Sequence, residues 1–438
     1  MKSILRNIFP LFAAAAVLFS CTKVEKEVII RHKHVHAFIM MSFGFTDGIG
    51  PYLKENISVM EKGPVPDGGN DENLLFLYTH NSGRDGKVTA PELVRVYRDD
   101  AGALVHENVL TFSTTDIPNT GENISKVLEC IRDRYQADSY GMLISSHGTG
   151  WLPSGYMSAP DRYEGISGDI WSSAKKAGRQ GRHMNAPVPY IPKDDDGPVV
   201  KSIGATWTDD THASMYETDI MELADAIPFT MEYIIFDACY MGGAEVAYEL
   251  KDKCRWLCAS QTEILGDGMD YVHLLDRLLK DGGPDPEAVC SDFFSLYDSQ
   301  SGSNRSATVS MVDCSRIDVL AAVCRTIFRN HGIDYDSCDK GALQQFFRNR
   351  NRKTQKWFYD LRSIMAAAGA DEIELADLDW ALEQCVVYKA ATERFMNDFD
   401  IKTFCGLSMY LPYPERNYLN SYYKELTWNK TTGLLRGE

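Results

Sequence analysis

Short strand-like segments alternate with helix-like segments along most of the chain, and this alternation restricts the fold more than any other feature. Apolar stretches rich in β-branched and aromatic residues occur at 35–44, 73–80, 93–98, 103–112, 140–151, 233–239, 255–260 and 306–313. Between strands, apolar residues recur with helical spacing, as at Ile124, Val127, Leu128 and Ile131. Strands joined through helices run parallel, and the helices then cover both faces of the sheet. We therefore predict an α/β fold with a mostly parallel sheet flanked by helices.

The same patterns divide the chain into regions. Residues 35–330 carry the alternation, whereas residues 331–438 are mainly helical in pattern, with a returning strand near 404–411. The stretch 152–207 is rich in glycine, proline, serine and charge, so we predict a long exposed insertion there. The basic run at 349–356 is interpreted as a solvated helix face or a connection between helices, because the net charge of −17 argues against nucleic acid as a partner.

The N-terminal residues 1–20 have the order of parts of a signal peptide. Lys2 and Arg6 precede an apolar run that is too short to span a bilayer and that ends at Cys21. The sequence Leu-x-Ser-Cys resembles a bacterial lipobox, in which a peptidase cuts before the cysteine and the thiol then carries lipid. We predict an exported lipoprotein of the cell envelope, with residues 21–34 as the linker from the membrane, and leave cleavage without lipidation open.

Metal ligands and disulfides are not signalled. His32, His34 and His36 lie on one face of an extended chain, which is compatible with a metal, but we interpret them as part of the polar linker. Residues 193–197 (KDDDG) lack the full spacing of a calcium loop. The chain has 11 cysteines without a Cys-x-x-Cys pair, so apart from Cys21 we expect buried thiols and leave disulfides open.

Two strand-like segments end in residues with reactive side chains. His147 follows the strand at 140–146 and Cys239 ends the strand at 233–239, and each is followed by glycines. The carboxyl ends of parallel strands meet at one edge of the sheet, so the two side chains are expected in one cleft. A thiol beside a proton acceptor is a nucleophile, and a histidine can then protonate a leaving amine. The N–H groups of Gly148 and Cys239 could face a developing oxyanion.

The segments SSHGTGW (145–151) and FDACYMGG (236–243), in this order, resemble the clostripain family of cysteine peptidases, relatives of caspases, gingipains and legumains. ASQTEILGDGMDY (259–271) and GLSMYLPYP (406–414) are similar to later blocks of that family. The resemblance covers most of the chain from about residue 35 to 414. It implies a caspase-like catalytic domain over 35–330, with His147 as the acid and base and Cys239 as the nucleophile of a thioester mechanism.

The resemblance also implies cleavage after arginine or lysine, and a basic side chain needs a carboxylate. Asp237 lies two residues before Cys239 and so points to the same face of a strand. Asp267 lies between two glycines just after the next strand, and the family places acids at both positions. Plain structural roles stay open for both: a hydrogen bond to the turn for Asp237 and ordinary turn chemistry for Asp267.

Many members of the family mature by cleavage of a loop between the two catalytic strands. The insertion 152–207 occupies this place and contains the basic residues Lys175, Lys176, Arg179, Arg182 and Lys193. The chemistry requires no cofactor, but some relatives use calcium, which is left open. Two alternatives to a peptidase of peptide and protein substrates also stay open: a catalytically silent relative that binds peptides or proteins, and a transpeptidase that uses the same two residues.

Overall fold

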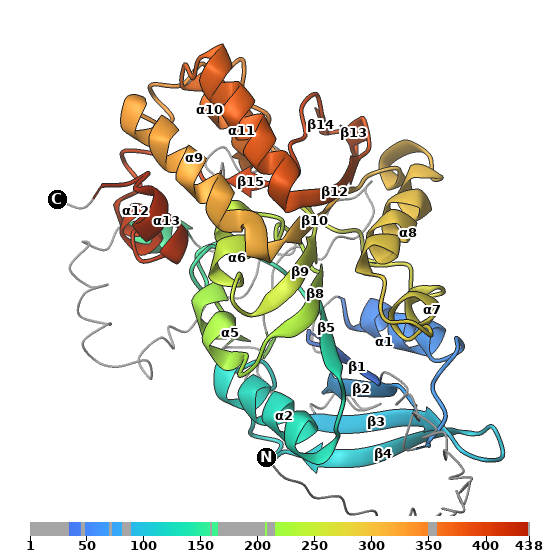
Figure 1. Ribbon diagram of the computed structural model, residues 1–438. Coiled ribbons are helices and arrows are strands. Elements are labelled where there is room, and N and C mark those ends of the chain that lie inside the picture. The colour runs from blue at the N-terminus through green and yellow to red at the C-terminus, as the bar shows by residue number, and fades with distance from the viewer. Residues whose placement is uncertain are drawn as a thin grey trace, which may run out of the picture. The chain divides into compact units, whose positions relative to one another are not determined.

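Figure 1 shows the computed structural model of the protein and the residues that it describes. These are residues 35–44, 49–69, 72–80, 89–157, 160–164, 206–207, 215–348 and 357–436. The predicted leader, Cys21, the linker and most of the predicted insertion lie outside these ranges, as does the basic run at 349–356.

A nine-stranded sheet forms the centre of the fold, in the order β12-β10-β9-β8-β5-β1-β2-β3-β4. The five middle strands are parallel: β9 (Cys254–Ala259), β8 (Met231–Asp237), β5 (Ser139–Ser145), β1 (His36–Ser42) and β2 (Leu74–Thr79). The two strands at each edge are antiparallel: β10 (Thr308–Asp313) with β12 (Val386–Ala391), and β3 (Glu92–Arg98) with β4 (Leu104–Thr111). The predicted mostly parallel sheet flanked by helices is confirmed.

Helices cover both faces of the sheet (Figure 1). One face carries α1 (Gly50–Met60), α7 (Leu274–Leu278) and α8 (Pro286–Asp298), and the other carries α2 (Gly121–Arg134), α5 (Ile220–Ala226), α6 (Ala244–Glu249) and α9 (Ile317–Asn330). The apolar stripe predicted from Ile124, Val127, Leu128 and Ile131 is buried in α2. The side chain of Thr120 caps this helix by accepting from the Asn123 N–H. Both faces of β1 and β2 are therefore buried, which explains their continuous apolar sequences.

The C-terminal region is mainly helical, as predicted. Its helices are α10 (Leu361–Ala367), α11 (Glu372–Cys385), α12 (Asn417–Tyr423) and α13 (Thr427–Thr432). The returning strand near 404–411 is reduced to β15 (Ser408–Met409), which pairs with β11 (Tyr359–Asp360) and forms a bridge to Gly243. The buried carboxylate of Glu245 accepts hydrogen bonds from the Tyr410 N–H and the Tyr423 hydroxyl, both at 2.8 Å. This region is thus fastened to the helix that follows Cys239.

Three features differ from the sequence-based expectations. Helices α1 and α8 were not predicted, and β12 continues directly from α11, where the pattern indicated helix alone. Residues 152–157 are mostly buried, so the predicted exposure of the insertion is wrong for its first residues.

No helix in the described ranges is both long and apolar enough to cross a membrane. The remaining short elements are α3 (Pro160–Glu164), β6 (Thr206–Trp207), β7 (Met215–Tyr216), β13 (Arg394–Phe395) and β14 (Phe399–Asp400).

Candidate active site

The two strand ends singled out in the sequence meet at one edge of the sheet. Strands β5 and β8 are parallel neighbours in which Ser145 pairs with Asp237, so His147 and Cys239 each lie two residues beyond this pair. Gly148 packs directly on the backbone of Cys239, since a Cβ atom at position 148 would lie 2.3 Å from the Cys239 carbonyl oxygen and 2.8 Å from its nitrogen. Only glycine permits this approach. The fold thus brings the His147–Gly148 and Cys239 segments into contact.

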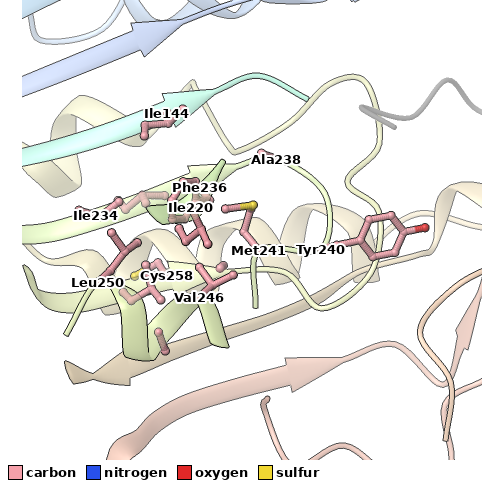
Figure 2. Packing of buried hydrophobic residues seen from close by; sticks show 14 of the residues in the cluster. Ile144, Ile220, Ile234, Phe236, Ala238, Tyr240, Met241, Val246, Leu250 and Cys258 are labelled. Carbon is pink, nitrogen blue, oxygen red and sulfur yellow. The ribbon is translucent and has the colours of Figure 1, made fainter. Parts of the chain in front are cut away.

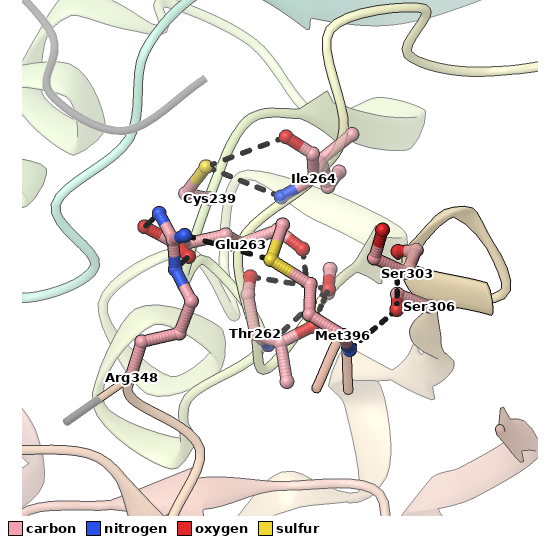
Figure 3. A network of polar contacts seen from close by, with 9 residues as sticks. Cys239, Thr262, Glu263, Ile264, Ser303, Ser306, Arg348 and Met396 are labelled. Carbon is pink, nitrogen blue, oxygen red and sulfur yellow. Dashed lines mark hydrogen bonds and ion pairs between the residues drawn. The ribbon is translucent and has the colours of Figure 1, made fainter. Parts of the chain in front are cut away.

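The Cys239 thiol is fully buried in this structure. Its Sγ atom accepts a hydrogen bond from the Ile264 N–H at 3.2 Å and lies 3.9 Å from the Ile264 carbonyl oxygen (Figure 3). The neighbouring Glu263 forms a buried bidentate ion pair with Arg348, at 2.5 and 3.2 Å. Because Arg348 belongs to the C-terminal region, this region contributes to the closed surroundings of the thiol.

The turn after Cys239 has an unusual backbone. Tyr240 has a φ of 62°, in the left-handed region that residues other than glycine seldom adopt. Its N–H donates to the Thr262 carbonyl oxygen at 2.9 Å, and its ring stacks on Phe358 at 4.5 Å. Such strain persists only where the surroundings fix it, and it concentrates at functional sites. No sequence pattern indicated this conformation at a tyrosine.

Gly242 has a packing role. A Cβ atom there would lie 2.3 Å from the side-chain nitrogen of Gln261. This amide is buried and donates to Ser310 Oγ at 2.7 Å and to the Gly406 carbonyl oxygen at 2.8 Å. The glycine therefore lets the turn approach a buried polar network that joins β10 to the C-terminal region.

The two predicted carboxylates lie on the α7 and α8 face of the sheet. Asp237 is buried and accepts hydrogen bonds from Ser145 Oγ at 2.7 Å and the Tyr271 hydroxyl at 2.6 Å. Asp267 is exposed in the turn after β9. Burial raises the pKa of Tyr297, and the charges of both aspartates raise it further, which places the two acids around one side chain. Asp237 thus has a structural role as a hydrogen-bond acceptor, and both carboxylates lie near enough to Tyr297 to influence its pKa.

Sequence reasoning missed Tyr271. It is the last residue of the block 259–271, and its hydroxyl donates a hydrogen bond to Asp237. Burial raises its pKa, and the charge of Asp237 raises it further, so the hydroxyl stays protonated as a donor. A tyrosine within a block that resembles a peptidase family was the available signal.

A pocket opens on the other face of the sheet, with half-buried His147 and with Gly148 in its lining. It encloses about 630 Å³, including open solvent at its mouth. Its walls are largely apolar, but Glu217 and Asn119 also line it. The Gly155 N–H donates to Glu217 Oε2 at 2.5 Å, and burial raises the pKa of Glu217 to about 7. Nothing in the sequence distinguished Glu217 from an ordinary acid before a helix.

The other residues considered for metal binding or disulfides have plain structural surroundings where they are described. His36 is buried and hydrogen-bonds to Ser139 Oγ at 2.8 Å and to the Tyr233 hydroxyl at 3.0 Å. His32, His34 and residues 193–197 lie outside the described residues. No group of three or more potential metal ligands occurs within the described ranges. The ten cysteines after Cys21 are free thiols, and nine of them are buried, as expected for small apolar side chains.

Three solved structures with a similar fold are peptidases by description. An inactive zymogen of a C11 protease from Parabacteroides distasonis is 24% identical, with a TM-score of 0.67, and the match covers 92% of this chain and 99% of that one. A secreted C11 cysteine protease from Bacteroides thetaiotaomicron, called iotapain, is 23% identical with a TM-score of 0.66, covering 91% and 99%. A secreted C11 cysteine protease from the same species, in complex with an irreversible peptide inhibitor, is 19% identical with a TM-score of 0.66. That match covers 91% of this chain and 98% of the other. At these identities the likeness shows the fold.

The family assignment comes from the sequence itself. No curated protein matches the chain. The model of the clostripain family, however, matches residues 192–433, which is more than half of the chain and includes Cys239 and both predicted carboxylates. His147 lies before the matched range, so its assignment depends on the fold, in which β5 delivers it beside β8. The caspase-like sheet and this match agree, and the chain belongs to the clostripain family of cysteine peptidases.

Proposed function

We propose that the protein is an endopeptidase that cuts after arginine or lysine, with Cys239 as nucleophile and His147 as acid and base. The observation that carries this proposal is the contact between Gly148 and the Cys239 backbone. This contact brings together two strand ends that are distant in sequence. It lies at the edge of a parallel sheet where the active sites of such folds are found.

The proposed reaction is acyl transfer. The Cys239 sulfur attacks the scissile carbonyl carbon, and the thiol proton passes to His147. The tetrahedral oxyanion would lie against the N–H groups of Cys239 and Gly148, which the close packing of Gly148 on the Cys239 backbone keeps near each other. His147 then protonates the leaving amine, the C–N bond breaks and a thioester remains. Water, deprotonated by His147, hydrolyses the thioester and restores the thiol.

Specificity is assigned to the two aspartates. The buried Asp237, oriented by Ser145 and Tyr271, would receive the cationic end of the residue before the scissile bond. Asp267 lies nearer to solvent around the same Tyr297 and would add a second carboxylate. A guanidinium and an ammonium would both fit this chemistry. Turnover of matched arginine and lysine peptides gives the order of preference.

Maturation is part of the proposal, because the thiol is closed here. A substrate carbonyl has to reach Sγ, so the surroundings formed by Ile264 and the Glu263–Arg348 pair must open or shift. We propose self-cleavage within the insertion 152–207 as the trigger. A denaturing gel of the wild-type chain beside Cys239→Ala tests it: two fragments are expected for the first and one band for the second. Identical single bands would contradict it.

Export and anchoring complete the proposal. The leader-like residues 1–20 and the lipobox-like ending support secretion and acylation at Cys21. The mass of the mature N-terminal peptide, compared with that of Cys21→Ala, distinguishes a lipoprotein from a soluble secreted form. Calcium is tested by the activity of the matured enzyme with and without a chelator.

Aminocoumarin peptides ending in arginine or lysine test the function. Turnover by the matured wild type is expected, with its loss in both Cys239→Ala and His147→Ala. Absent turnover in the matured wild type would favour a binding protein, and the closed thiol is the observation that keeps this second candidate. Added amine acceptors, with products weighed by mass spectrometry, would reveal a transpeptidase.

A further inference from the structure

We propose that the pocket below His147 is a second specificity site, which takes an ammonium or guanidinium side chain directly after the scissile bond. This inference rests on the proposed function. The pocket lies between the sheet and helices α2 and α5, with His147 at its rim, and nothing in the proposed reaction so far uses it.

The pocket and Asp237 lie on opposite faces of the same strands. Side chains alternate along a strand, so Ile144, Phe236 and Ala238 point away from the face that carries Ser145 and Asp237. All three of the former line the pocket. Figure 2 shows them within the buried cluster at the ends of β5 and β8. The chain thus has a separate acid on each side of the Cys239 corner.

The polar lining of the pocket is rich in acceptors. Glu217 is only 7% exposed, and its Oε1 atom has no hydrogen-bond partner among the described residues. The Oδ1 atom of Asn119 is likewise unpartnered in the described part of the chain, while its amide nitrogen donates to the Tyr216 carbonyl oxygen at 3.1 Å. Buried polar atoms seldom stay unpaired. Two unused acceptors in one pocket fit a ligand that donates hydrogen bonds.

The charge and the apolar walls of the pocket further restrict the class of ligand that would fit it. Ile124, Ile220 and Leu223 form its helical side, so an aliphatic stem would be buried along them. A carboxyl at the polar end favours a cation over a neutral donor. The pKa of Glu217 near 7 fits this role, because an incoming cation would complete its ionisation at neutral pH. A lysine or arginine side chain has this combination of stem and head.

The position relative to the scissile bond follows from backbone geometry. Successive side chains of an extended peptide point in opposite directions. If the residue before the scissile bond points to Asp237, the next one points towards the opposite face, where the pocket lies. His147, which protonates the amine of that next residue, is at the rim. The pocket is therefore assigned to the residue that carries the leaving amine.

Paired internally quenched peptides test this assignment. Each peptide has arginine before the scissile bond and either lysine or norleucine after it, so that only the ammonium group differs. We expect the matured wild type to prefer lysine by about 10- to 100-fold in kcat/KM, as for a hydrogen bond to a charged group. In Glu217→Gln the ratio should fall to within about threefold of unity. Glu245→Gln, a matched buried glutamate outside the pocket, should keep the wild-type ratio.

Aminocoumarin substrates separate the two levels of the proposal, because they carry no residue after the scissile bond. Turnover of the coumarin substrate with equal cleavage of the lysine and norleucine peptides would overturn the second site and leave the proposed function intact. If no substrate is turned over, binding provides the test. Calorimetry then measures the affinity of full-length Cys239→Ala for Lys-Ala-amide and for norleucine-Ala-amide. At least about tenfold tighter binding of the lysine dipeptide, lost on adding Glu217→Gln, supports the site. Equal binding overturns it.

Discussion

Asp237 and Glu217 are two buried acids on opposite faces of the sheet, at the same edge and beside the same strand ends. Asp237 accepts two side-chain hydrogen bonds, from Ser145 and Tyr271. Glu217 accepts one backbone hydrogen bond, from Gly155, and borders a cavity. Two side-chain donors from different segments hold the first acid, whereas one backbone donor holds the second, which faces a cavity. We infer that the first is preorganised for a strict requirement and the second for a preference.

Glu245 shows that an unused oxygen alone does not make a site. Burial raises its pKa to about 7, as for Glu217, and its Oε2 atom also has no partner within the described residues. This oxygen, however, faces the backbone of Gly243, and the carboxylate is enclosed by Tyr410 and Tyr423. The cavity beside Glu217 is the feature that separates a candidate site from a structural contact.

Asp237→Asn should have the largest effect. Removing one partner of a buried charged pair costs roughly 2–5 kcal/mol, so kcat/KM for an arginine aminocoumarin peptide should fall about 1,000-fold. The ratio between lysine and norleucine after the scissile bond should persist in longer peptides. Glu245→Gln is the control for a buried acid outside both sites. A loss of less than about tenfold would place the cation-binding carboxylate elsewhere and end the contrast between the two faces.

Gly148→Ala tests the corner that both faces share. The added Cβ would lie 2.3 Å from the Cys239 carbonyl oxygen, so the corner must shift and the proposed oxyanion donors would separate. Loss of one such donor lowers kcat about 100-fold or more. Because the defect is central, coumarin and quenched peptides should lose the same factor. Gly332→Ala, which has open space around it, is the control. Unequal losses would show that the two faces do not share one reaction centre.

The sequence predicted the elements that local pattern determines. The parallel strands, helix 121–134 and the two reactive strand ends follow from apolar spacing and from glycines after His147 and Cys239. The partners of those residues did not follow. Tertiary packing brings Glu217, Tyr271 and Arg348 to the site from distant parts of the sequence. Local sequence patterns could not predict these contacts, because they depend only on neighbouring residues. Helix α8 was not predicted, although the capping Asp285 and the proline at its start are ordinary signals of a helix N-terminus.

The dependence of stability on pH sharpens the comparison at Glu217. Burial raises its pKa to about 7 from the ordinary value of 4.5, so the folded state binds more protons than the unfolded state between these pH values. The free energy of unfolding should therefore fall as pH rises from about 4.5 to above 7. A shift of this size corresponds to at most roughly 3 kcal/mol. Denaturant unfolding of Glu217→Gln at pH 5 and 8 should show a smaller fall than the wild type.

Glu245→Gln provides the parallel measurement for that prediction. Its carboxyl has a similarly raised pKa, so its variant should lose a similar part of the pH dependence. Addition of Lys-Ala-amide at pH 8 should stabilise the wild type and Glu245→Gln, but not Glu217→Gln. A pH profile of Glu217→Gln identical to that of the wild type would mean that Glu217 is not held protonated by burial, and the contrast with Asp237 would lose its basis.

Tyr271→Phe should have the smallest effect, and it asks whether orientation of Asp237 matters. The variant removes one of two hydrogen bonds to Oδ2 and keeps the ring, and a typical hydrogen bond contributes about 1 kcal/mol. We expect kcat/KM for arginine substrates to fall about fivefold, with the lysine preference after the scissile bond unaltered. Tyr248→Phe, which loses a tyrosine–carboxylate bond to Asp318 on another part of the fold, should change kcat/KM less than twofold. Equal effects of the two variants would mean that Asp237 needs no second donor, and preorganisation would no longer distinguish it from Glu217.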